Sequence, residues 1–552
     1  MSTDGSFVIA GQVVDVIAGT TQPSEVSVRE GRVVAVRPVR HAPNRWIMPG
    51  FIDAHVHIES SMLTPVEFAR MAAPFGTVAT VSDPHEIANV LGLPGIDFML
   101  ANAAMSPLKF HFGASSCVPA SPFETSGATL DVAAVRNLLR RPDIHFLSEV
   151  MNWPGVIAGD AAVIGKIEAA RALGKPVDGH APGLRGSELA VYVRAGIATD
   201  HETFELDEGR EKIALGMKLI LRQGSGARNL DALLPLLDEF PNRCMLCTDD
   251  IHPDLLESGH IDRLVRRAIR GGVSHMKVLR AATLNPALHY GLDVGLLQPG
   301  DSADFIVTTN PNDLRVLETW IAGVKVANAS GALFPSVQMK PLNAFRTQAV
   351  SLADIALAGH HGRVHVIDVV DGQVFTGRST HTLPLTSGGA LAPDPDDDVI
   401  KLVVVNRYRP QRPAIAFVRG FGLREGALAS SVAHDSHNII ACGCNDSDLV
   451  EAINAVIRHK GGLAFAQGSR RAVLKLPVAG LMSDRPGQAV AKDYRELTRL
   501  AVGTGSSLSA PYMALSFLAL TVIPRLKLSD LGLVDTEAQA FISVAIDDPA
   551  AQ

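Results

Sequence analysis

The sequence predicts an α/β protein built around a closed (β/α)8 barrel, with a small β domain beside the barrel and a further α/β domain after it. Between residues 49 and 285, short apolar runs alternate with helix-like stretches such as "GDAAVIGKIEAARALG". Eight apolar runs can be counted there, beginning with "GFIDAHVH". Strands that alternate with helices at this spacing indicate a parallel sheet with crossover helices, and eight such units favour a barrel.

The small β domain is predicted from two separate segments. Residues 1–48 contain "FVIAGQVVDVI" and "EVSVREGRVVAVRP", in which Val and Ile alternate. Strand-like text returns in residues 286–335 with "GLLQPGDSADFIVTTNP" and "VLETWIAGVKVANAS". Because such runs, broken by Gly, Asn and Pro, are typical of strands, we expect both segments to form one composite β domain.

The third domain is predicted over residues 336–552. It contains a polar loop rich in Pro and Asp, "STHTLPLTSGGALAPDPDDD". Strand and helix text follows in "KLVVVNRYR" and "DLVEAINAVIRHKGGLAFAQ". The barrel is therefore predicted to comprise residues 49–285.

Composition and charge exclude several classes of protein. Of the 552 residues, 47% are hydrophobic and 19% are charged, which supports a large core and is compatible with a homo-oligomer, a dimer or larger. The net charge of −7 and the lack of a long Lys/Arg tract argue against a nucleic acid partner. The chain shows neither a signal peptide nor an apolar run of about 18 residues, so we expect no membrane partner. Five scattered cysteines are too few for a disulfide framework, which favours the reducing cytoplasm.

The first barrel strand ends in a pair of histidines, His55 and His57. Side chains two positions apart in a strand point the same way, so both imidazoles can bind one ion. Catalytic residues of a barrel lie at the carboxyl ends of its strands. Other residues that could bind metal also follow apolar runs, namely Glu149, His180, His201 and Asp249.

This combination of residue types indicates a metal centre. Two imidazoles per ion together with carboxylates suit divalent first-row metals. Glu149 would bridge two ions, and coordination would lower the pKa of a water molecule and make it a nucleophile. Asp249 would take the proton of the water and pass it to the leaving group. The alternative is that these residues are ordinary polar loop tips.

Longer motifs place the sequence near a known family. "PGFIDAHVHIES" resembles the opening of the amidohydrolase superfamily, and the ordered set of His, Glu and Asp resembles its binuclear members. The resemblance narrows to bacterial adenine deaminases and extends over nearly the whole chain, carried by "HIESSML", "SDPHEIANVLG", "MNWPGV", "DGHAPGL", "HDSHNIIACG", "PVAGLMS" and "VIPRLKLSD".

The resemblance implies a TIM-like metal-dependent hydrolase barrel, a composite β-sandwich domain and an adenine-deaminase-type C-terminal domain. It implies the hydrolysis of adenine to hypoxanthine and ammonia, with a metal-activated hydroxide attacking C6. The implied cofactors are two divalent ions, Mn²⁺ or Fe²⁺, with Zn²⁺ as a further possibility. The implied metal ligands are His55, His57, Glu149, His180, His201 and Asp249.

The reaction also needs an acid, because attack at C6 breaks the aromaticity of the ring and protonation of a ring nitrogen assists it. Glu86, in "SDPHEIAN", is the candidate for this role and for substrate contact. Burial would keep it protonated near neutral pH. Alternatively, Glu86 merely begins a helix, where acidic residues are favoured.

Arg222 and Ser225 are candidate contacts for the polar edge of the purine. They lie in "RQGS", where the family pattern reads Arg-Glu-Gly-Ser. A salt bridge for Arg222 and a turn hydroxyl for Ser225 are equally compatible with the sequence. The pair His434 and His437 in "VAHDSHNII" favours a hydrogen-bonded loop; a further metal site and a contribution to the active site are the alternatives.

Two other functions remain open at this point. The chain would act on a different aminopurine or a cyclic amide if it were another binuclear amidohydrolase, because members of the superfamily share the metal ligands. A purine-binding protein without catalytic activity is the second alternative. The presence of all six ligand residues argues against the latter.

Overall fold

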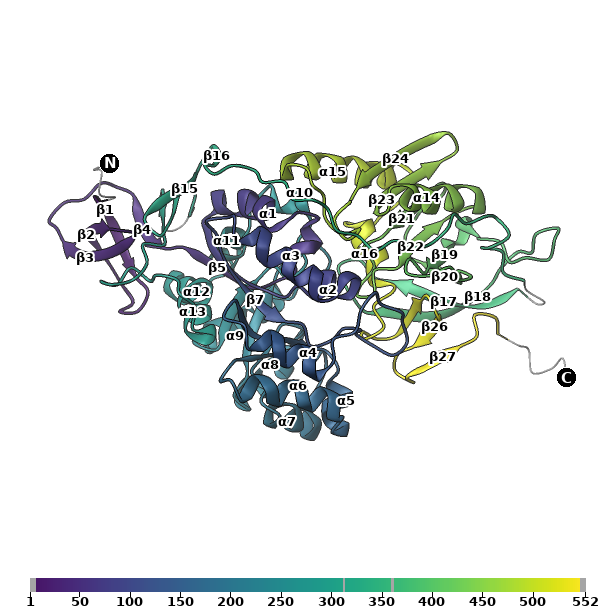
Figure 1. Cartoon of the computed structure of the whole chain (residues 1–552), viewed down its shortest axis with the longest axis horizontal. Helices are drawn as coiled ribbons and strands as arrows, with labels where there is room; N and C mark the ends of the chain where they lie inside the picture. The colour runs from purple at the N-terminus through teal and green to yellow at the C-terminus, as the bar shows by residue number, and fades with distance from the viewer. Residues whose placement is uncertain (1–5, 311–312, 359–361, 547–552) are drawn as a thin grey trace.

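The computed structural model describes residues 6–310, 313–358 and 362–546. Figure 1 shows three parts in a row: an N-terminal sheet at one end, a barrel in the middle and a C-terminal domain at the other end.

The barrel strands form two parallel sheets that join into one ring. The first sheet contains β5 (Phe51–Val56), β6 (Thr77–Ser82), β7 (Lys109–Ala114), β8 (Ile144–Val150) and β9 (Val177–Gly179). The second contains β10 (Thr199–Asp200), β11 (Lys218–Arg222) and β12 (Cys244–Cys247). Backbone hydrogen bonds from Ala198 to Val177 and from Asp249 to His55, 2.9 and 3.0 Å long, close the two seams. The predicted (β/α)8 barrel is therefore confirmed.

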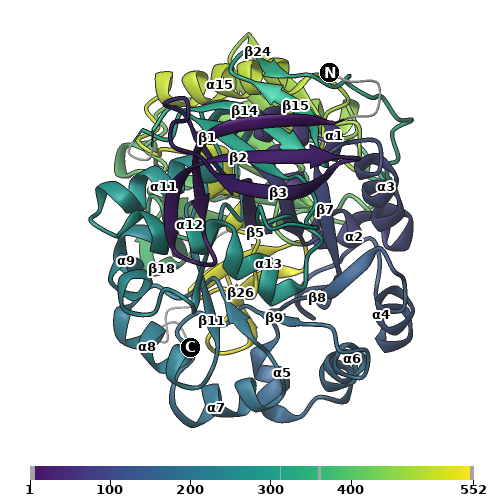
Figure 2. The same ribbon diagram turned by 90° about the vertical axis from the view of Figure 1, so that its left-hand side faces the viewer.

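Helices between the strands cover the outside of the barrel. Figure 2 shows α4, α6, α7 and α8 around its lower side and the N-terminal strands β1–β3 in front of it. Local sequence fixes several helix starts; for example, the Asp131 carboxylate accepts a hydrogen bond from the Ala134 amide at the start of α4. The helices are α1 (Pro65–Ala72), α2 (His85–Leu91), α3 (Leu93–Ala103), α4 (Val132–Leu139), α5 (Trp153–Ala158), α6 (Ala161–Arg171), α7 (Gly186–Arg194), α8 (Leu206–Ala214), α9 (Leu230–Glu239), α10 (Pro253–Leu256), α11 (Ile261–Arg270), α12 (His275–Ala282) and α13 (Leu284–Tyr290).

The N-terminal sheet combines strands from both ends of the barrel segment. Its order is β16-β15-β14-β13-β4-β1-β2-β3. The strands are β1 (Phe7–Asp15), β2 (Thr20–Arg29), β3 (Arg32–Pro38), β4 (Trp46–Pro49), β13 (Phe305–Thr308), β14 (Val316–Ile321), β15 (Val324–Asn328) and β16 (Gly331–Ala332). The antiparallel pairing of Met48 with Ile306 joins the two segments. Instead of two separate layers, the strands form one continuous sheet with a small core of its own, which includes Ile9, Phe305 and Trp320.

The C-terminal domain is a second eight-stranded sheet with helices packed on it. Its order is β18-β17-β20-β19-β22-β21-β23-β24. These strands are β17 (Arg363–Val369), β18 (Thr376–Thr382), β19 (Val399–Val405), β20 (Ala414–Arg419), β21 (Ala427–Ser430), β22 (Ile439–Gly443), β23 (Gly462–Gln467) and β24 (Arg470–Lys475). Helices α14 (Asp446–Arg458), α15 (Gly487–Gly503) and α16 (Pro511–Phe517) and a small sheet of β25 (Leu526–Ser529), β26 (Gly532–Asp535) and β27 (Ala540–Ile542) complete it.

The C-terminal domain packs against the end of the barrel at which the strands terminate. The Asn438 side chain donates a hydrogen bond to the carbonyl of Thr125, and the Thr125 amide donates to Asp530. His252, which follows β12, lies 2.5 Å from the Tyr494 hydroxyl on α15. This contact places the C-terminal domain over the barrel mouth. In the described part of the chain, no helix combines the length and hydrophobicity required to cross a bilayer.

Candidate active site

The structure brings all six predicted metal-binding side chains together at the carboxyl ends of the barrel strands. Each comes from the end of a strand or from the first residues after it, and each is buried. Because the ends of parallel barrel strands meet on one rim, residues far apart in the sequence converge there. The six are His55 and His57 at β5, Glu149 in β8, His180 after β9, His201 after β10 and Asp249 after β12.

The Glu149 carboxylate lies at the centre of this group. Its Oε1 is 3.1 Å from His57 Nε2. Its Oε2 is 2.6 Å from His180 Nδ1 and 3.3 Å from His201 Nε2. One carboxylate oxygen therefore faces the histidines of the first strand, and the other faces those of the fifth and sixth strands.

Asp249 lies beside the two histidines of the first barrel strand. Its Oδ1 lies 3.3 Å from His55 Nε2 and 3.1 Å from His57 Nε2. The backbone of Asp249 has a φ of 55°, a left-handed conformation that is uncommon outside glycine. Two backbone hydrogen bonds to the ends of β5, with His55 and His57, hold it in this conformation. The turn directs the carboxylate toward the two histidines.

The donor atoms fit a divalent cation. His57 Nδ1 lies 3.2 Å from the backbone carbonyl of Asp83, so this nitrogen carries the proton and donates it. Its Nε2 then presents a lone pair to the centre, as ligating histidines do. His55 Nε2 lies only 3.2 Å from that nitrogen. A cation between such nitrogens and the carboxylates satisfies all of them, and an imidazole–carboxylate set suits divalent first-row metals.

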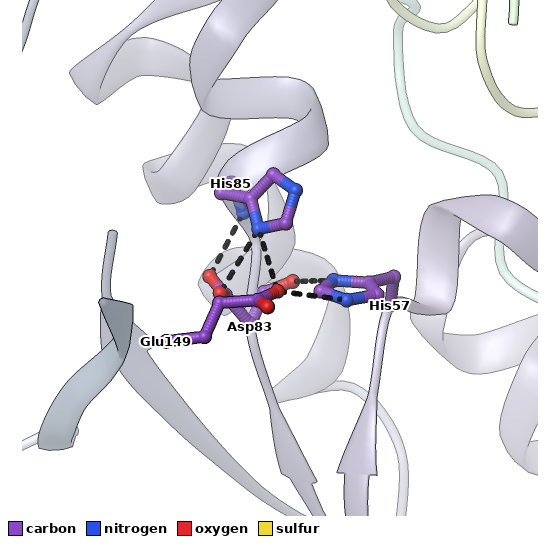
Figure 3. A group of neighbouring side chains, drawn as sticks. All are labelled: His57, Asp83, His85 and Glu149. Carbon is purple, nitrogen blue, oxygen red and sulfur yellow. Dashed lines mark hydrogen bonds and ion pairs between the residues drawn. The ribbon is translucent and has the colours of Figure 1, made fainter. Parts of the chain in front are cut away.

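A further pair, Asp83 and His85, follows the second strand and lies against the same carboxylate. Figure 3 shows the Glu149 carboxylate between His57 and His85. His85 Nδ1 is 2.9 Å from Asp83 Oδ2 and 3.4 Å from Glu149 Oε1. Burial lowers the pKa of His85, but the carboxylates of Asp83 and Glu86 outweigh it and raise that pKa well above its ordinary value. The position of "SDPHE" after an apolar run was the sequence signal for this pair.

Arg222 lies buried at the end of β11, where it bonds to two carboxylates. It donates hydrogen bonds to Glu202 and to Asp249. Burial acts to raise the pKa of Asp249, but Arg222, together with His55 and His57, holds it well below its ordinary value. Asp249 is therefore ionised. Glu202, which sequence reasoning did not single out, is adjacent to the candidate ligand His201 and lines the same cavity.

Ser225 forms a hydrogen bond within the protein, in line with the turn hydroxyl that was one of its two expected roles. Its hydroxyl oxygen accepts a 2.8 Å hydrogen bond from the His252 backbone amide. Among the described residues, the cavity lining includes Arg222 but not Ser225. Ser225 thus connects the loops that follow β11 and β12.

Glu86 lies in the first turn of α2, where two histidines of the C-terminal domain contact its carboxylate. Its Oε1 is 2.7 Å from His434 Nδ1, and its Oε2 is hydrogen-bonded to His437 Nε2. Burial acts to raise the pKa of Glu86, but His434, His437 and His85 lower it well below its ordinary value. The expectation that burial keeps Glu86 protonated is therefore wrong, because three imidazoles surround the carboxylate and stabilise its charge.

Asp250 also lines the cavity. Its Oδ1 accepts a 2.5 Å hydrogen bond from the hydroxyl of Ser60. Burial and the neighbouring charge of Asp249 raise the pKa of Asp250 to about 6. It therefore contacts a serine in the loop that follows the first barrel strand.

These residues enclose a cavity of about 30 Å³, which has room for one or two water molecules. Small-molecule sites usually measure about 300–1,000 Å³, so the cavity is too small for a heterocycle and must widen before one can bind. Its barrel side is polar. Its opposite side comes from the C-terminal domain and contains Val374, His434, Asp435, Phe517, Leu520 and Ile523. The sequence did not predict the four apolar residues of this wall, because no local pattern marks them.

Two family models match the chain. The model of the amidohydrolase family matches residues 46–326, and that of the adenine deaminase C-terminal domain matches residues 373–540.

Curated relatives match over nearly the full length. An adenine deaminase of Salinibacter ruber is 52% identical over 545 residues, which are 98% of this chain and 99% of the relative. An adenine deaminase of Methanosarcina mazei is 47% identical over 551 residues, again 98% and 99% of the two chains. Among solved structures, a β-aspartyl dipeptidase from Fervidobacterium islandicum AW-1 aligns with a TM-score of 0.45 at 14% identity, covering 62% of this chain and all of that one.

Proposed function

The chain belongs to the adenine deaminases of the amidohydrolase family, enzymes that hydrolyse adenine, and on that premise we propose how its residues produce hypoxanthine and ammonia. Membership implies a divalent metal. The observation that carries the proposal is the position of Glu149, whose two oxygens face two separate pairs of histidines.

Two ions are proposed, sharing Glu149. His55, His57 and Asp249 would hold one ion, and His180 and His201 would hold the other. Bound divalent ions supply a water molecule whose pKa is lowered to near neutrality. The mixture of imidazole and carboxylate donors suits Mn²⁺, Fe²⁺ or Zn²⁺, and the resemblance of the motifs to bacterial adenine deaminases favours the first two.

Asp249 is proposed as the base. It is ionised, because Arg222 lies against its Oδ2. Its Oδ1 lies beside His55 and His57, the side chains that would hold the ion and its water. A carboxylate in this position takes a proton from the water and returns it to the departing amine. Arg222 orients the base and remains a proposed contact of the purine; Ser225 positions the loop beside it.

Glu86 is proposed to act on the ring side of the substrate. It lines the same cavity as the apolar residues Phe517 and Leu520. Since its pKa is low, Glu86 acts as an anion that holds hydrogen-bond donors rather than as the proton source. The apolar wall provides a surface on which a flat purine can lie.

The domain boundaries are also a proposal: residues 1–48 with 286–335, residues 49–285 and residues 336–552. The sheet that joins β4 to β13 supports the first, composite domain. A homo-oligomer in the cytoplasm is proposed as well. All five cysteines of the chain are free thiols, as expected in a reducing compartment.

The test is ammonia release from the purified protein after chelation and reloading with Mn²⁺, Fe²⁺ or Zn²⁺ separately. Adenine, other aminopurines and dihydropyrimidines are the substrates. We expect adenine to be preferred and about two metal ions per chain to be required. Turnover of dihydropyrimidines without turnover of adenine would favour a different amidohydrolase. Tight adenine binding by the loaded protein without ammonia release would favour a binding protein.

A further inference from the structure

The loop between β21 and β22 extends from the C-terminal domain into the active site. Its two histidines, His434 and His437, contact the two oxygens of Glu86, with His434 Nδ1 at 2.7 Å from Oε1. All three side chains are buried. Two arrangements explain such a group: a further metal site or a hydrogen-bond network.

The backbone decides between them. The amide of Ala433 donates a hydrogen bond to His437 Nδ1 over 3.2 Å. A ring nitrogen that accepts a hydrogen bond carries no proton, so the proton of neutral His437 is on Nε2. That proton is donated to Glu86. His437 Nε2 therefore has no lone pair available for a metal, and the group is a hydrogen-bond network.

His434 differs from His437 because one of its ring nitrogens has no hydrogen-bond partner among the described residues. Its Nδ1 donates to Glu86, while its Nε2 has no hydrogen-bond partner within the described protein and is buried. His434 is part of the cavity wall. Its ring stacks on Phe517, with centroids 5.0 Å apart and planes at 27°. Two contacts thus fix the ring, and its Nε2 is a buried nitrogen without a partner among the described residues, on a side chain that lines the cavity.

We propose that His434, as an imidazolium, donates its Nε2 proton to the adenine ring nitrogen next to C6, with Glu86 as the residue that positions it. This inference depends on the proposed deamination. It gives the C-terminal domain a catalytic residue, and it explains why an ionised Glu86 lies beside the substrate cavity.

Charges around His434 support this role. Burial lowers its pKa, but Glu86, Asp250 and Asp435 outweigh that effect and raise it to about 9. The pKa of His437, on the same loop, is lowered by burial and by the charge of His434, which outweigh the effect of Glu86. His252, which follows β12, is kept neutral because burial and the charge of His434 lower its pKa to about 3. His434 is therefore charged at neutral pH, as is His85, the other imidazole beside Glu86 whose pKa is raised.

The atoms balance with water as the only co-substrate. Attack of the water oxygen forms the C6–O bond and breaks the C6–N1 π bond, whose electrons take the His434 proton at N1. Asp249 passes one water proton to the amine, the C6–N bond breaks and ammonia leaves. The remaining hydroxyl proton is released as the C6 carbonyl forms, and a proton returns to His434. The product keeps the proton on N1, as hypoxanthine requires.

The first test is His434→Gln, compared with His252→Gln as a matched buried histidine that does not line the cavity. Glutamine retains a hydrogen-bond donor but cannot release a proton. We expect kcat for adenine to fall by about 10²–10⁴-fold, the usual contribution of a general acid, with a much smaller change in KM. The metal content should equal that of the wild type. His252→Gln should remain within a few-fold of the wild type.

The second test does not depend on the folding of that variant. The alkaline limb of the wild-type pH profile of kcat/KM should follow the loss of the His434 proton. Glu86→Gln removes the charge that contributes most to the high pKa of His434, so the alkaline limb should move to lower pH. A purely structural role for Glu86 would leave the limb in place.

Three results would overturn the proposal: a near-normal kcat in His434→Gln, the loss of one metal equivalent from it, or an alkaline limb that does not move in Glu86→Gln. If the wild type itself releases no ammonia from adenine, the proposed function fails instead, so the two failures are distinguishable.

Discussion

The Arg222 guanidinium bonds to the Asp249 carboxylate between the ends of neighbouring barrel strands, and it binds Glu202 at the same time. One buried cation thus serves two buried carboxylates. We expect Arg222→Met to remove the guanidinium that both carboxylates share. Removing one partner of a buried ion pair typically costs about 3–5 kcal/mol, so thermal unfolding should show a lower Tm, and ammonia release should be lost.

A double variant separates stability from function. In Arg222→Met with Glu202→Met, Asp249 alone is left without the guanidinium, because Glu202 has been removed as well. Part of the lost Tm should therefore return, while deamination stays absent. If the single variant kept the Tm and rate of the wild type, Arg222 would have no role in orienting the base.

Removal of one metal ligand should abolish activity and preserve the fold. His55→Ala deletes a ligand but leaves the barrel sheets and the N-terminal sheet intact, because neither depends on that imidazole. We expect metal analysis to show loss of metal, and ammonia release to fall below about one thousandth of the wild-type rate, beyond the loss expected from a single acid–base group. Far-UV circular dichroism should be unchanged. His41→Ala, an exposed histidine in a loop, is the control; unfolding of His55→Ala would contradict the expectation.

Lys527 predicts a pH-dependent stability. It is buried in β25, and its ammonium group donates hydrogen bonds to the carbonyls of Val374 and Phe517. Burial lowers its pKa to about 7, against about 10.4 in an unfolded chain. Between these values the unfolded state binds the extra proton, so the free energy of unfolding gains a contribution from Lys527 as pH rises from 7 to 10.

Comparison with Lys527→Met isolates this contribution. The difference in Tm, wild type minus variant, should increase from pH 7 to pH 9.5, because only the wild type carries this titrating group. Below pH 7 the group is charged in both states, and the difference should level off. A difference that is constant with pH would show that Lys527 stays charged in the folded protein.

The small active-site cavity predicts that adenine enters through a neighbouring space. A larger cavity of about 420 Å³ lies between the barrel and the C-terminal domain, and Met151 lines both cavities. Val522, next to the wall residue Ile523, lines the larger one. Val522→Trp should fill this space and lower kcat/KM for adenine by about tenfold, equivalent to about 1.4 kcal/mol, without changing the metal content. Val502→Trp, at an exposed position on α15, is the control; equal kcat/KM in both variants would rule out this route.

The sequence by itself predicted the barrel and its metal-binding rim. The eight strands are local features, encoded by short apolar runs between helices, and the rule that chemistry lies at strand ends then selected His55, His57 and the other four candidate ligands. The i, i+2 spacing sufficed to place the first two on one face. No long-range information was needed for these conclusions, because each depends on a few neighbouring residues.

Only the tertiary structure decided which groups are charged and which face one another. Glu86 and His434 are 348 positions apart, and no local pattern links them. Burial alone suggested a protonated Glu86, but the imidazoles around it reverse that result, since a pKa depends on the charges within a few ångströms. Arg222 likewise proved to bind Asp249 and Glu202. Periodicity along a chain determines its strands, whereas the partners of a buried charge are set only when distant segments pack together.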